Sequence, residues 1–349
     1  MNRRITQRDI AREAGVSHVT VSLALRESPS IPKHTRDHIR AIAERIGYSP
    51  DPMLMALSSY KKQQRPAAHQ ATIAWVIGSP AATKTGEGDF MGYYLGAEAR
   101  AQQLGYVLET IDIKGELGEP KRLRRLLEAR NITGLILAPS HLPPHLNHGF
   151  DFDLSRYSAV RIGYSYRTPV LNTVVNAQFR TTLAAVQKVV AMGYRRVGMI
   201  LTKEVDERTY WQFSGAYLAG VHMLPRKNWI DPFYAPKVDW EKDFFEWFEK
   251  QKIDCLVAAG YGWLCRAMIQ RGIKIPEEVG YVDTQLPEVE SYFTGLHQNA
   301  RQIGRGAVDL LVGMMHRHEV GLPETPSHLL IEGSWRDGET ASFRPVIKA

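Results

Sequence analysis

Basic side chains gather at the start of this 349-residue chain, and the chemistry open to them is the binding of a polyanion. Residues 1–65 hold twelve lysines and arginines against six acidic residues, a net charge of +6. The rest of the chain holds 32 basic and 31 acidic side chains. A basic segment on a nearly neutral body suggests a polyanion-binding head on a separate module. A solvated tail is the alternative, but this segment also carries the apolar periodicity that a tail lacks.

The chain offers few residues for catalysis or metal binding. It has no Gly-x-Ser-x-Gly elbow, no P-loop and no His-Glu-x-x-His motif. The spaced glycines of 86–92 do not fit a dinucleotide-binding pattern and indicate a loop before a helix. His141, His145 and His148 lie close together, but Pro143-Pro144 prevents a helical ligand face. We therefore expect no catalytic residue, no metal and no cofactor.

Composition indicates an ordinary globular protein, with 44% hydrophobic and 23% charged residues. At about 150 residues per domain, its length suggests two or three domains. The longest uncharged apolar stretch, Ala71 to Gly78, is too short to span a bilayer. Residues 1–9 are polar where a signal peptide needs an apolar core. The two cysteines, Cys255 and Cys265, cannot form a disulfide framework, so we expect a reducing cytoplasm.

Three short helices are predicted in the basic segment. Thr6 is a suitable cap for a first helix, which Gly15 ends because glycine takes a left-handed conformation cheaply. Ser17 is a suitable cap for a second helix. A third begins near Pro32 and stops at Gly47.

The spacing of three residues in these helices predicts a helix-turn-helix. Ala11, Gly15 and Val21 fall four and then six residues apart. A helix-turn-helix needs a small residue where the two helices touch, a glycine in the turn and a β-branched residue in the core of the second helix. An ordinary three-helix bundle is the alternative.

The same segment resembles the head of the lac/galactose repressor (LacI-type) family of transcriptional regulators. The resemblance rests on Ile10–Ser17, Thr20–Ser22, Thr35-Arg36 and Ile46–Pro50, all in register. It covers the head closely and the rest of the chain in outline. It implies a homodimer that binds duplex DNA at a palindromic operator.

The resemblance also implies which side chains touch DNA. In that family the start of the second helix enters the major groove, and the matching base-reading positions are His18, Val19 and Leu23. Many members have arginine where this chain has Leu23; leucine cannot make the bidentate contact to guanine but can pack on a thymine methyl group. The matching phosphate-binding positions are Ser17, Thr20, Ser22 and Thr35, and the cations Arg8, Arg12, Arg26 and Lys33 are phosphate contacts or solvated charges.

A short hinge is expected between the head and the body. Asp51-Pro52 begins a helix whose apolar residues recur at helical spacing as far as residue 60. The resemblance implies that this helix folds on DNA and pushes Leu57 into the minor groove as a wedge that kinks the duplex. A dimer contact without a wedge is the alternative. Residues 61–70 are interpreted as a basic linker.

From Ala71, apolar β-rich runs alternate with helical stretches, which predicts parallel α/β sheets. The runs are 72–77, 107–111, 134–138, 159–162, 197–201, 255–259 and 279–282, and the helical stretches include 92–104, 121–129, 179–192 and 240–250. Residues 191–198 resemble the family's entry into its second lobe, and 275–281 resemble the last strand there. The resemblance implies a two-lobed body like that of periplasmic sugar-binding proteins.

The expected organisation is an all-α helix-turn-helix head on an α/β, two-lobed, periplasmic-binding-protein-like body with parallel sheets. The chain is expected to cross between the lobes near 164–169, 294–299 and 322–326. The expected domains are 1–50 (helix-turn-helix), 51–60 (hinge helix), 61–70 (linker) and 71–349 (ligand-binding and dimerisation body), with lobe one about 71–166 and 297–323 and lobe two about 167–296 and 324–349.

Ligands of parallel sheets bind outside the carboxyl ends of the strands, which locates the expected effector cleft. Two departures from the family weaken a sugar preference: Gln212 stands where many relatives have arginine, and Val282 where many have aspartate. For each aromatic candidate, packing in the core is the alternative. The candidates are Ser79, Phe90, Ser140, Tyr164, Thr202, Arg208, Trp211, Gln212, Tyr261, Trp263, Asp283 and Gln298.

These observations predict a ligand-controlled transcriptional regulator, most simply a repressor, with a small molecule such as a sugar as effector. A transport-class binding protein is the second hypothesis, and it would need a signal peptide. An α/β enzyme with an accessory head is the third, and it would need a catalytic set. No apolar heptads follow Gly338, so we expect a dimer rather than a tetramer held by a coiled coil.

Overall fold

The computed structural model divides the chain into two units. The first is Met1–Gln70 with His316–Glu319, and the second is Ala71–Met315 with Val320–Ala349. Among the described residues, no helix is both long and apolar enough to cross a membrane. The residues that the structure describes are 5–25, 31–48, 71–78, 89–113, 119–140, 150–236, 238–287 and 292–344.

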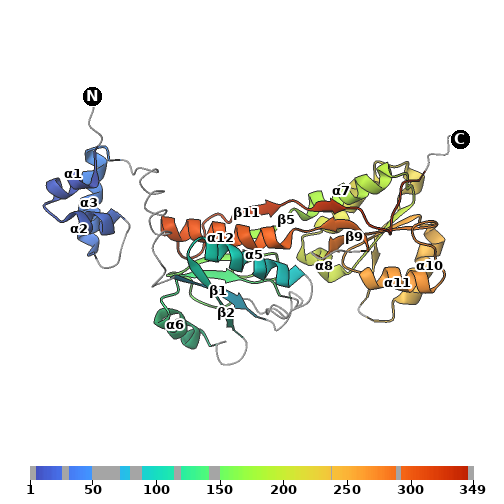
Figure 1. Ribbon diagram of the computed structural model, residues 1–349, viewed down its shortest axis with the longest axis horizontal. Helices are drawn as coiled ribbons and strands as arrows, with labels where there is room; N and C mark the ends of the chain where they lie inside the picture. Colours follow the sequence, from blue (N-terminus) through green and yellow to red (C-terminus); the bar gives the residue numbers. More distant parts are fainter. Residues whose placement is uncertain are drawn as a thin grey trace. The chain divides into compact units, whose positions relative to one another are not determined.

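The head contains the three helices that the sequence predicts: α1 (Gln7–Ala14), α2 (His18–Leu25) and α3 (Lys33–Arg45) (Figure 1). At the start of α1, the Thr6 hydroxyl and backbone N–H both donate to Asp9 Oδ2, at 2.7 and 2.9 Å. Ser17 caps α2, because its Oγ accepts from Thr20 N at 3.0 Å. Gly15 has φ +63° and Gly47 has φ +74°, so both turns use the left-handed region.

The head has its own small apolar core, which fixes how α1 and α2 cross. Ile10 and Val21 are fully buried, and Ile39 of α3 is buried against them. Ala11, the small residue of the helix-turn-helix spacing, is also buried in this cluster. The spacing of Ala11, Gly15 and Val21 therefore places Ala11 and Val21 in the contact between α1 and α2, as a helix-turn-helix requires.

The body contains two sheets of six strands each. In the first sheet every strand is parallel to its neighbours, in the order β11-β5-β4-β3-β1-β2. Its strands are β1 (Ala71–Ile77), β2 (Tyr106–Asp112), β3 (Gly134–Leu137), β4 (Ser158–Ile162), β5 (Asn172–Asn176) and β11 (His328–Ile331).

The second sheet has the order β12-β10-β9-β8-β6-β7 and is parallel except for β12. Its strands are β6 (Val197–Leu201), β7 (Phe233–Tyr234), β8 (Cys255–Ala258), β9 (Gly280–Leu286), β10 (Thr294–His297) and β12 (Ser334–Arg336). The sequence predicted β9 as the last strand of this lobe. That was wrong, because β10 and β12 follow it.

Helices cover both faces of each sheet, so each lobe has two apolar layers (Figure 1). In lobe one, α5 (Asp89–Gln103) and α12 (Ala300–Arg317) pack on one face and α6 (Pro120–Ala129) on the other. In lobe two, the two layers contain α7 (Gln178–Ala191) with α9 (Gln212–Val221), and α10 (Glu241–Gln251) with α11 (Gly262–Gln270). The other helices of the described residues are α8 (Lys203–Arg208) and a 3-10 turn at Arg226–Asn228.

The chain crosses between the lobes three times, but two crossings differ from those expected. β5 belongs to the first sheet and α7 to the second lobe, so the first crossing lies at 176–178 rather than 164–169. The third lies at 331–334 rather than 322–326, because β11 joins β5 before the chain leaves lobe one. The second crossing, at 297–300, agrees with the sequence. Lobe one is therefore 71–176 with 300–331.

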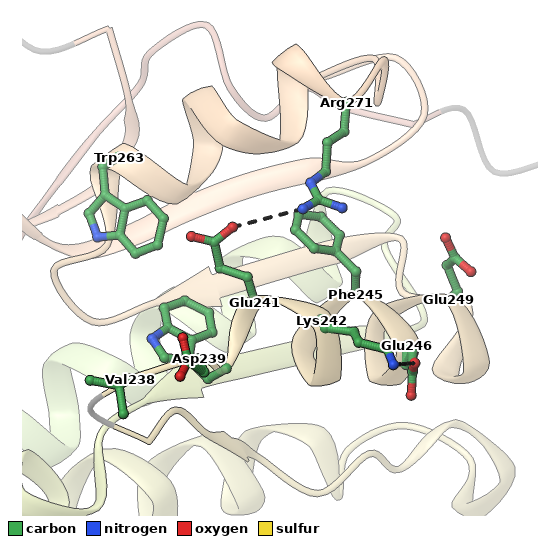
Figure 2. A pocket seen from close by; sticks show the side chains of 10 residues that line it. Val238, Asp239, Glu241, Lys242, Phe245, Glu246, Glu249, Trp263 and Arg271 are labelled. Carbon is green, nitrogen blue, oxygen red and sulfur yellow. Dashed lines mark ion pairs between the residues drawn. The ribbon is translucent and has the colours of Figure 1, made fainter.

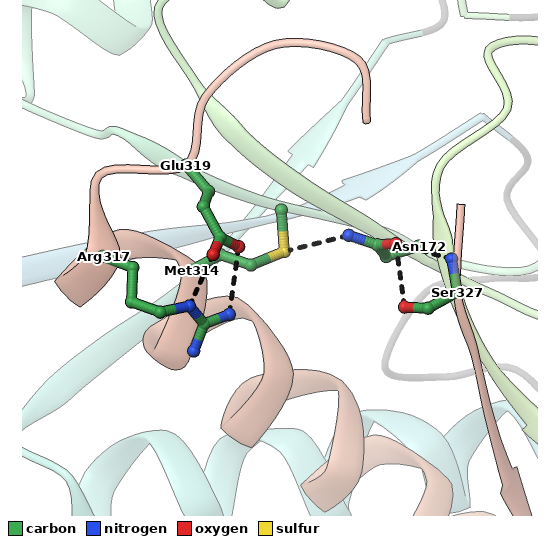
Figure 3. Close-up of polar contacts among 5 residues, drawn as sticks. All are labelled: Asn172, Met314, Arg317, Glu319 and Ser327. Atoms are coloured by element: carbon green, nitrogen blue, oxygen red, sulfur yellow. Dashed lines mark hydrogen bonds and ion pairs between the residues drawn. The ribbon is translucent and has the colours of Figure 1, made fainter. Parts of the chain in front are cut away.

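Side chains hold β11 at the edge of the first sheet. Asn172 Oδ1 accepts from Ser327 N at 2.8 Å and from Ser327 Oγ at 2.9 Å, and its amide nitrogen donates to Met314 Sδ at 3.6 Å (Figure 3). At the end of α12, Arg317 pairs with Glu319. Short polar segments such as 172–176 become strands here because neighbouring elements supply their partners, which their sequence alone does not reveal.

Candidate DNA-binding surface and ligand cleft

The start of α2 presents side chains to solvent rather than to the core of the head. Val19 is 64% exposed although valine is apolar, and His18 is exposed beside it. Leu23, one turn further on, is partly exposed. The three predicted base-reading residues therefore lie along one accessible part of α2, away from the buried Val21.

The candidate phosphate contacts surround this part of α2. Ser17 Oγ and Thr20 Oγ1 share a hydrogen bond of 2.8 Å, so two of these hydroxyls already bond each other. Arg12 lies 3.7 Å from Asp9 as an exposed pair of small energetic weight. Ser22 and Thr35 are partly exposed, and Arg8 and Lys33 are exposed. Arg26, Leu57 and Ser79 lie outside the described residues, as does the side chain of Phe90.

Residues from the two lobes contact each other at one point. The rings of Tyr164, after β4 of lobe one, and Tyr210, after α8 of lobe two, lie edge to face with centroids 5.5 Å apart. Gln212 Nε2 donates to Tyr164 Oη at 3.5 Å, a long bond. His328 of β11 lies 5.7 Å from the Tyr164 ring. The sequence named Tyr164 and Gln212 and missed Tyr210.

The loop between α8 and α9 has a strained backbone. Tyr210 and Trp211 have φ of +56° and +55°, a left-handed conformation that costs a side-chain-bearing residue energy. Hydrogen bonds from Trp211 N to Asp206 O (2.8 Å) and from Gly215 N to Trp211 O (2.9 Å) hold it. The result exposes the two rings, 62% for Tyr210 and 56% for Trp211, beside Arg208.

Arg208, at the end of α8, faces the other lobe. Removal of its guanidinium from water lowers its pKa, and Tyr93 of α5 in lobe one is close enough to oppose that effect. Thr202, at the start of the same helix, caps it by accepting from Val205 N at 3.2 Å. Arg208 and Tyr93 therefore extend the contact region between the lobes beyond the Tyr164–Tyr210 pair.

Several other candidates are buried and bonded within one lobe. Ser140 is buried, and its N–H donates to Ser165 Oγ at 3.0 Å. Asp283 Oδ1 accepts from Gly260 N at 3.0 Å and from Gln285 N at 2.8 Å. Gln298 Nε2 donates to Thr284 O at 3.4 Å. These residues shape the ends of strands rather than present free groups.

Tyr261 and Trp263 belong to an aromatic group of lobe two. Both rings pack against Trp240, with centroids 5.9 and 5.5 Å away. Trp263 also lines a surface pocket of about 920 Å³ beside α10 and α11, whose rim carries charges such as the Glu241–Arg271 pair at 3.8 Å (Figure 2). This pocket is made by lobe two alone and is separate from the Tyr164–Tyr210 contact.

Among the described residues, no group of three or more His, Cys, Asp and Glu side chains is placed to hold a metal ion. His141, His145 and His148 lie outside them. Cys255 and Cys265 are buried free thiols, and burial raises the pKa of Cys265 to about 12. Such thiols are unreactive at neutral pH.

A helix-turn-helix head joined to a two-lobed α/β body defines a class of ligand-responsive DNA-binding protein. The model of the lacI family of bacterial regulatory proteins matches residues 6–51. The match covers the head, so the chain carries a DNA-binding head of the lacI type. The chain is therefore a DNA-binding transcriptional regulator rather than an enzyme.

Repressors with known roles resemble the chain over nearly its whole length. The transcriptional repressor PurR of Pectobacterium atrosepticum is 21% identical, over 97% of this chain and 99% of that protein. The repressor CytR of Escherichia coli K12 is 24% identical, over 95% and 96%.

Solved structures share the fold. A complex of the regulator CelR with cellobiose has a TM-score of 0.54 at 20% identity, covering 97% of this chain and all of that one. The lac repressor dimer bound to operator and the anti-inducer ONPF has a TM-score of 0.53 at 19% identity, covering 97% and 99%. The expected two-lobed architecture is confirmed.

Proposed function

We propose that the chain is a repressor that binds a palindromic operator as a homodimer, with an affinity that changes when a small molecule binds between the lobes. The observation that carries this is the exposed start of α2 on the same chain as a cleft where Tyr164 and Tyr210 meet from different lobes. The lac repressor structure, a dimer on its operator, and the CelR–cellobiose complex support it. Such a protein works where the chromosome is, in the cytoplasm.

In this proposal His18, Val19 and Leu23 read bases. Exposed apolar side chains at Val19 and Leu23 suit thymine methyl groups, while His18 can donate or accept at a base edge. The hydroxyls around Ser17 and the basic residues of the head bind phosphates. Leu57 is the proposed minor-groove wedge of the hinge.

The effector side is centred on Tyr164, Arg208 and Gln212, with Trp211 beside them. Binding here bridges the lobes, so it favours a closed arrangement over an open one. The change in operator affinity and the reciprocal change in effector affinity must then be equal, and a typical coupling is about 1–3 kcal/mol. The buried Ser140, Asp283 and Gln298 support the walls of this cleft.

DNA binding is tested with the full-length protein by footprinting on the promoter nearest its own gene, at several salt concentrations. We expect one protected palindrome, with affinity that falls steeply as salt rises because phosphates release counterions. Val19→Ser should lower the affinity for the palindrome more than the affinity for a scrambled duplex, whereas Lys33→Gln should lower both affinities alike. Equal affinity for every duplex contradicts the proposal.

The oligomeric state is tested by sedimentation equilibrium of the free protein and of its complex with a duplex containing the palindrome. A two-fold dimer matches two half-sites, so we expect twice the mass of one chain in both samples. A stable monomer on one half-site contradicts the proposed dimer.

A further inference from the structure

Arg208 is partly buried and has no counter-ion among the described residues. Among the described residues, no hydrogen bond or ion pair engages its guanidinium, and its electrostatic neighbour is the neutral phenol of Tyr93. The carboxylates nearest in sequence are engaged elsewhere. Asp206 accepts from Ser214 N at 3.1 Å and from Tyr234 Oη at 2.8 Å, and Glu207 pairs with Lys203 at 3.7 Å.

A second guanidinium, in lobe one, also has no counter-ion among the described residues. Arg161 of β4 is 3% exposed and donates to two neutral oxygens, Thr173 Oγ1 at 2.8 Å and the Tyr166 carbonyl at 2.5 Å. Its electrostatic neighbours are Tyr210 and Tyr164, the two rings that meet between the lobes. Each lobe therefore brings one uncompensated cation to the region of that contact.

Burying a cation away from water is unfavourable unless an anion accompanies it. The guanidinium of Arg161 is held by the protein, because the hydrogen bonds of its Nε and Nη1 join it to β5 and to the loop after β4. Arg208 is not, and its five donors remain available for an oxygen-rich anion such as a carboxylate or phosphate. The exposed rings of Tyr210 and Trp211 beside it offer flat surfaces for the rest of such a molecule.

We propose that the effector is an anionic small molecule whose carboxylate or phosphate group binds Arg208. This inference rests on the proposed function of the interlobe cleft as the effector site. An anionic effector distinguishes the chain from a binder of neutral sugars. Many relatives have arginine at the position of Gln212, and in this chain Arg208, four residues earlier, supplies the guanidinium instead.

The anion site is tested by thermal unfolding of the full-length protein in inorganic phosphate or citrate, against chloride of equal ionic strength. We expect phosphate or citrate to raise the Tm of the wild type by about 2–4 °C over chloride, by binding the folded state. Arg208→Gln should abolish the rise. Lys203→Gln, which removes an exposed cation from the same helix, should keep it. No rise in the wild type, or an equal rise in Arg208→Gln, overturns the proposal.

The kind of anion and the regulatory role are separated by glucose, gluconate and glucose 6-phosphate, each measured by Tm and by operator release. A rise in Tm with gluconate alone indicates that the site binds a carboxylate. A rise with glucose 6-phosphate alone indicates that it binds a phosphate. Either result supports the anion site. Protection by glucose that persists in Arg208→Gln overturns the anionic class but leaves the cleft as the effector site. Protection by an anion that leaves operator affinity unchanged keeps the Arg208 site and contradicts the proposed function.

Discussion

Asp283 shows how burial changes the chemistry of a single residue. Desolvation raises the pKa of this carboxyl to about 6, outweighing the backbone N–H groups of Gln285 and Gly260 that favour its ionised form. An unfolded aspartate titrates near about 4. The folded chain therefore holds this proton more tightly, and stability from this group is present below about pH 4 and declines as the pH rises to about 6.

The Asp283→Asn variant keeps an oxygen that can accept from Gly260 N and Gln285 N but does not ionise. As the pH rises from about 4 to about 7.5, the free energy of unfolding of the variant should increase relative to that of the wild type by up to about 3 kcal/mol. Urea unfolding across this range measures it, with Asp151→Asn at an exposed position as the control. A difference that is constant with pH contradicts the raised pKa.

At the scale of elements, α5 and α12 pack closely because glycines face each other's backbone. A Cβ at Gly96 would overlap the Arg301 carbonyl oxygen, and a Cβ at Gly304 would overlap the Tyr93 carbonyl oxygen. Neither backbone can move far, since both helices cover the same buried layer of the first sheet. Tyr93 lies in this contact and also near Arg208, so the crossing of these helices positions the lobe-one side chain that faces Arg208.

Gly304→Ala should therefore destabilise the protein, by about 1–3 kcal/mol from overpacking. Gly306→Ala, on the same helix, is the matched control. Its new Cβ would lie 3.1 Å from Leu329 Cδ2, the end of a side chain that can move. The higher helix propensity of alanine should therefore offset the cost of this close contact. Chemical unfolding of both variants measures this, and equal stability of the two would mean that the helices can separate at no cost.

At the scale of the whole molecule, one side chain links the three crossings between the lobes. Asn176, at the end of β5, donates to Gln298 O at 3.2 Å and to Ile331 O at 3.0 Å. These carbonyls belong to the second and third crossings, while Asn176 begins the first. This side chain therefore holds the three crossings together.

Asn176→Ala removes both donors from buried carbonyls and should lower stability by about 1–3 kcal/mol. Asn228→Ala, in the 3-10 turn of lobe two, should change it by less than about 0.5 kcal/mol. Hydrogen exchange should show faster opening at residues 298 and 331 in Asn176→Ala alone. Unchanged exchange there would show that the crossings hold without this side chain.

The head was predictable from sequence because its signals are local. Caps at Thr6 and Ser17, the turn at Gly15 and the buried stripe through Val21 lie within one or two helical turns of each other. Long apolar runs such as β1 and β8 were also predictable, because strands buried on both faces consist almost wholly of apolar residues.

What the sequence by itself determined is the likeness of the head to the lacI family, the three helices of that head and the alternation of strands and helices in the body. The tertiary structure alone decided where the lobes divide, because β5 and β11 are short and pair only with residues far along the chain. It also decided which residues of the two lobes lie against each other. The local sequence around Tyr210 and Arg161 gives no sign that they lie at the contact between the lobes. They do so because the fold brings a loop of lobe two against the end of β4 in lobe one.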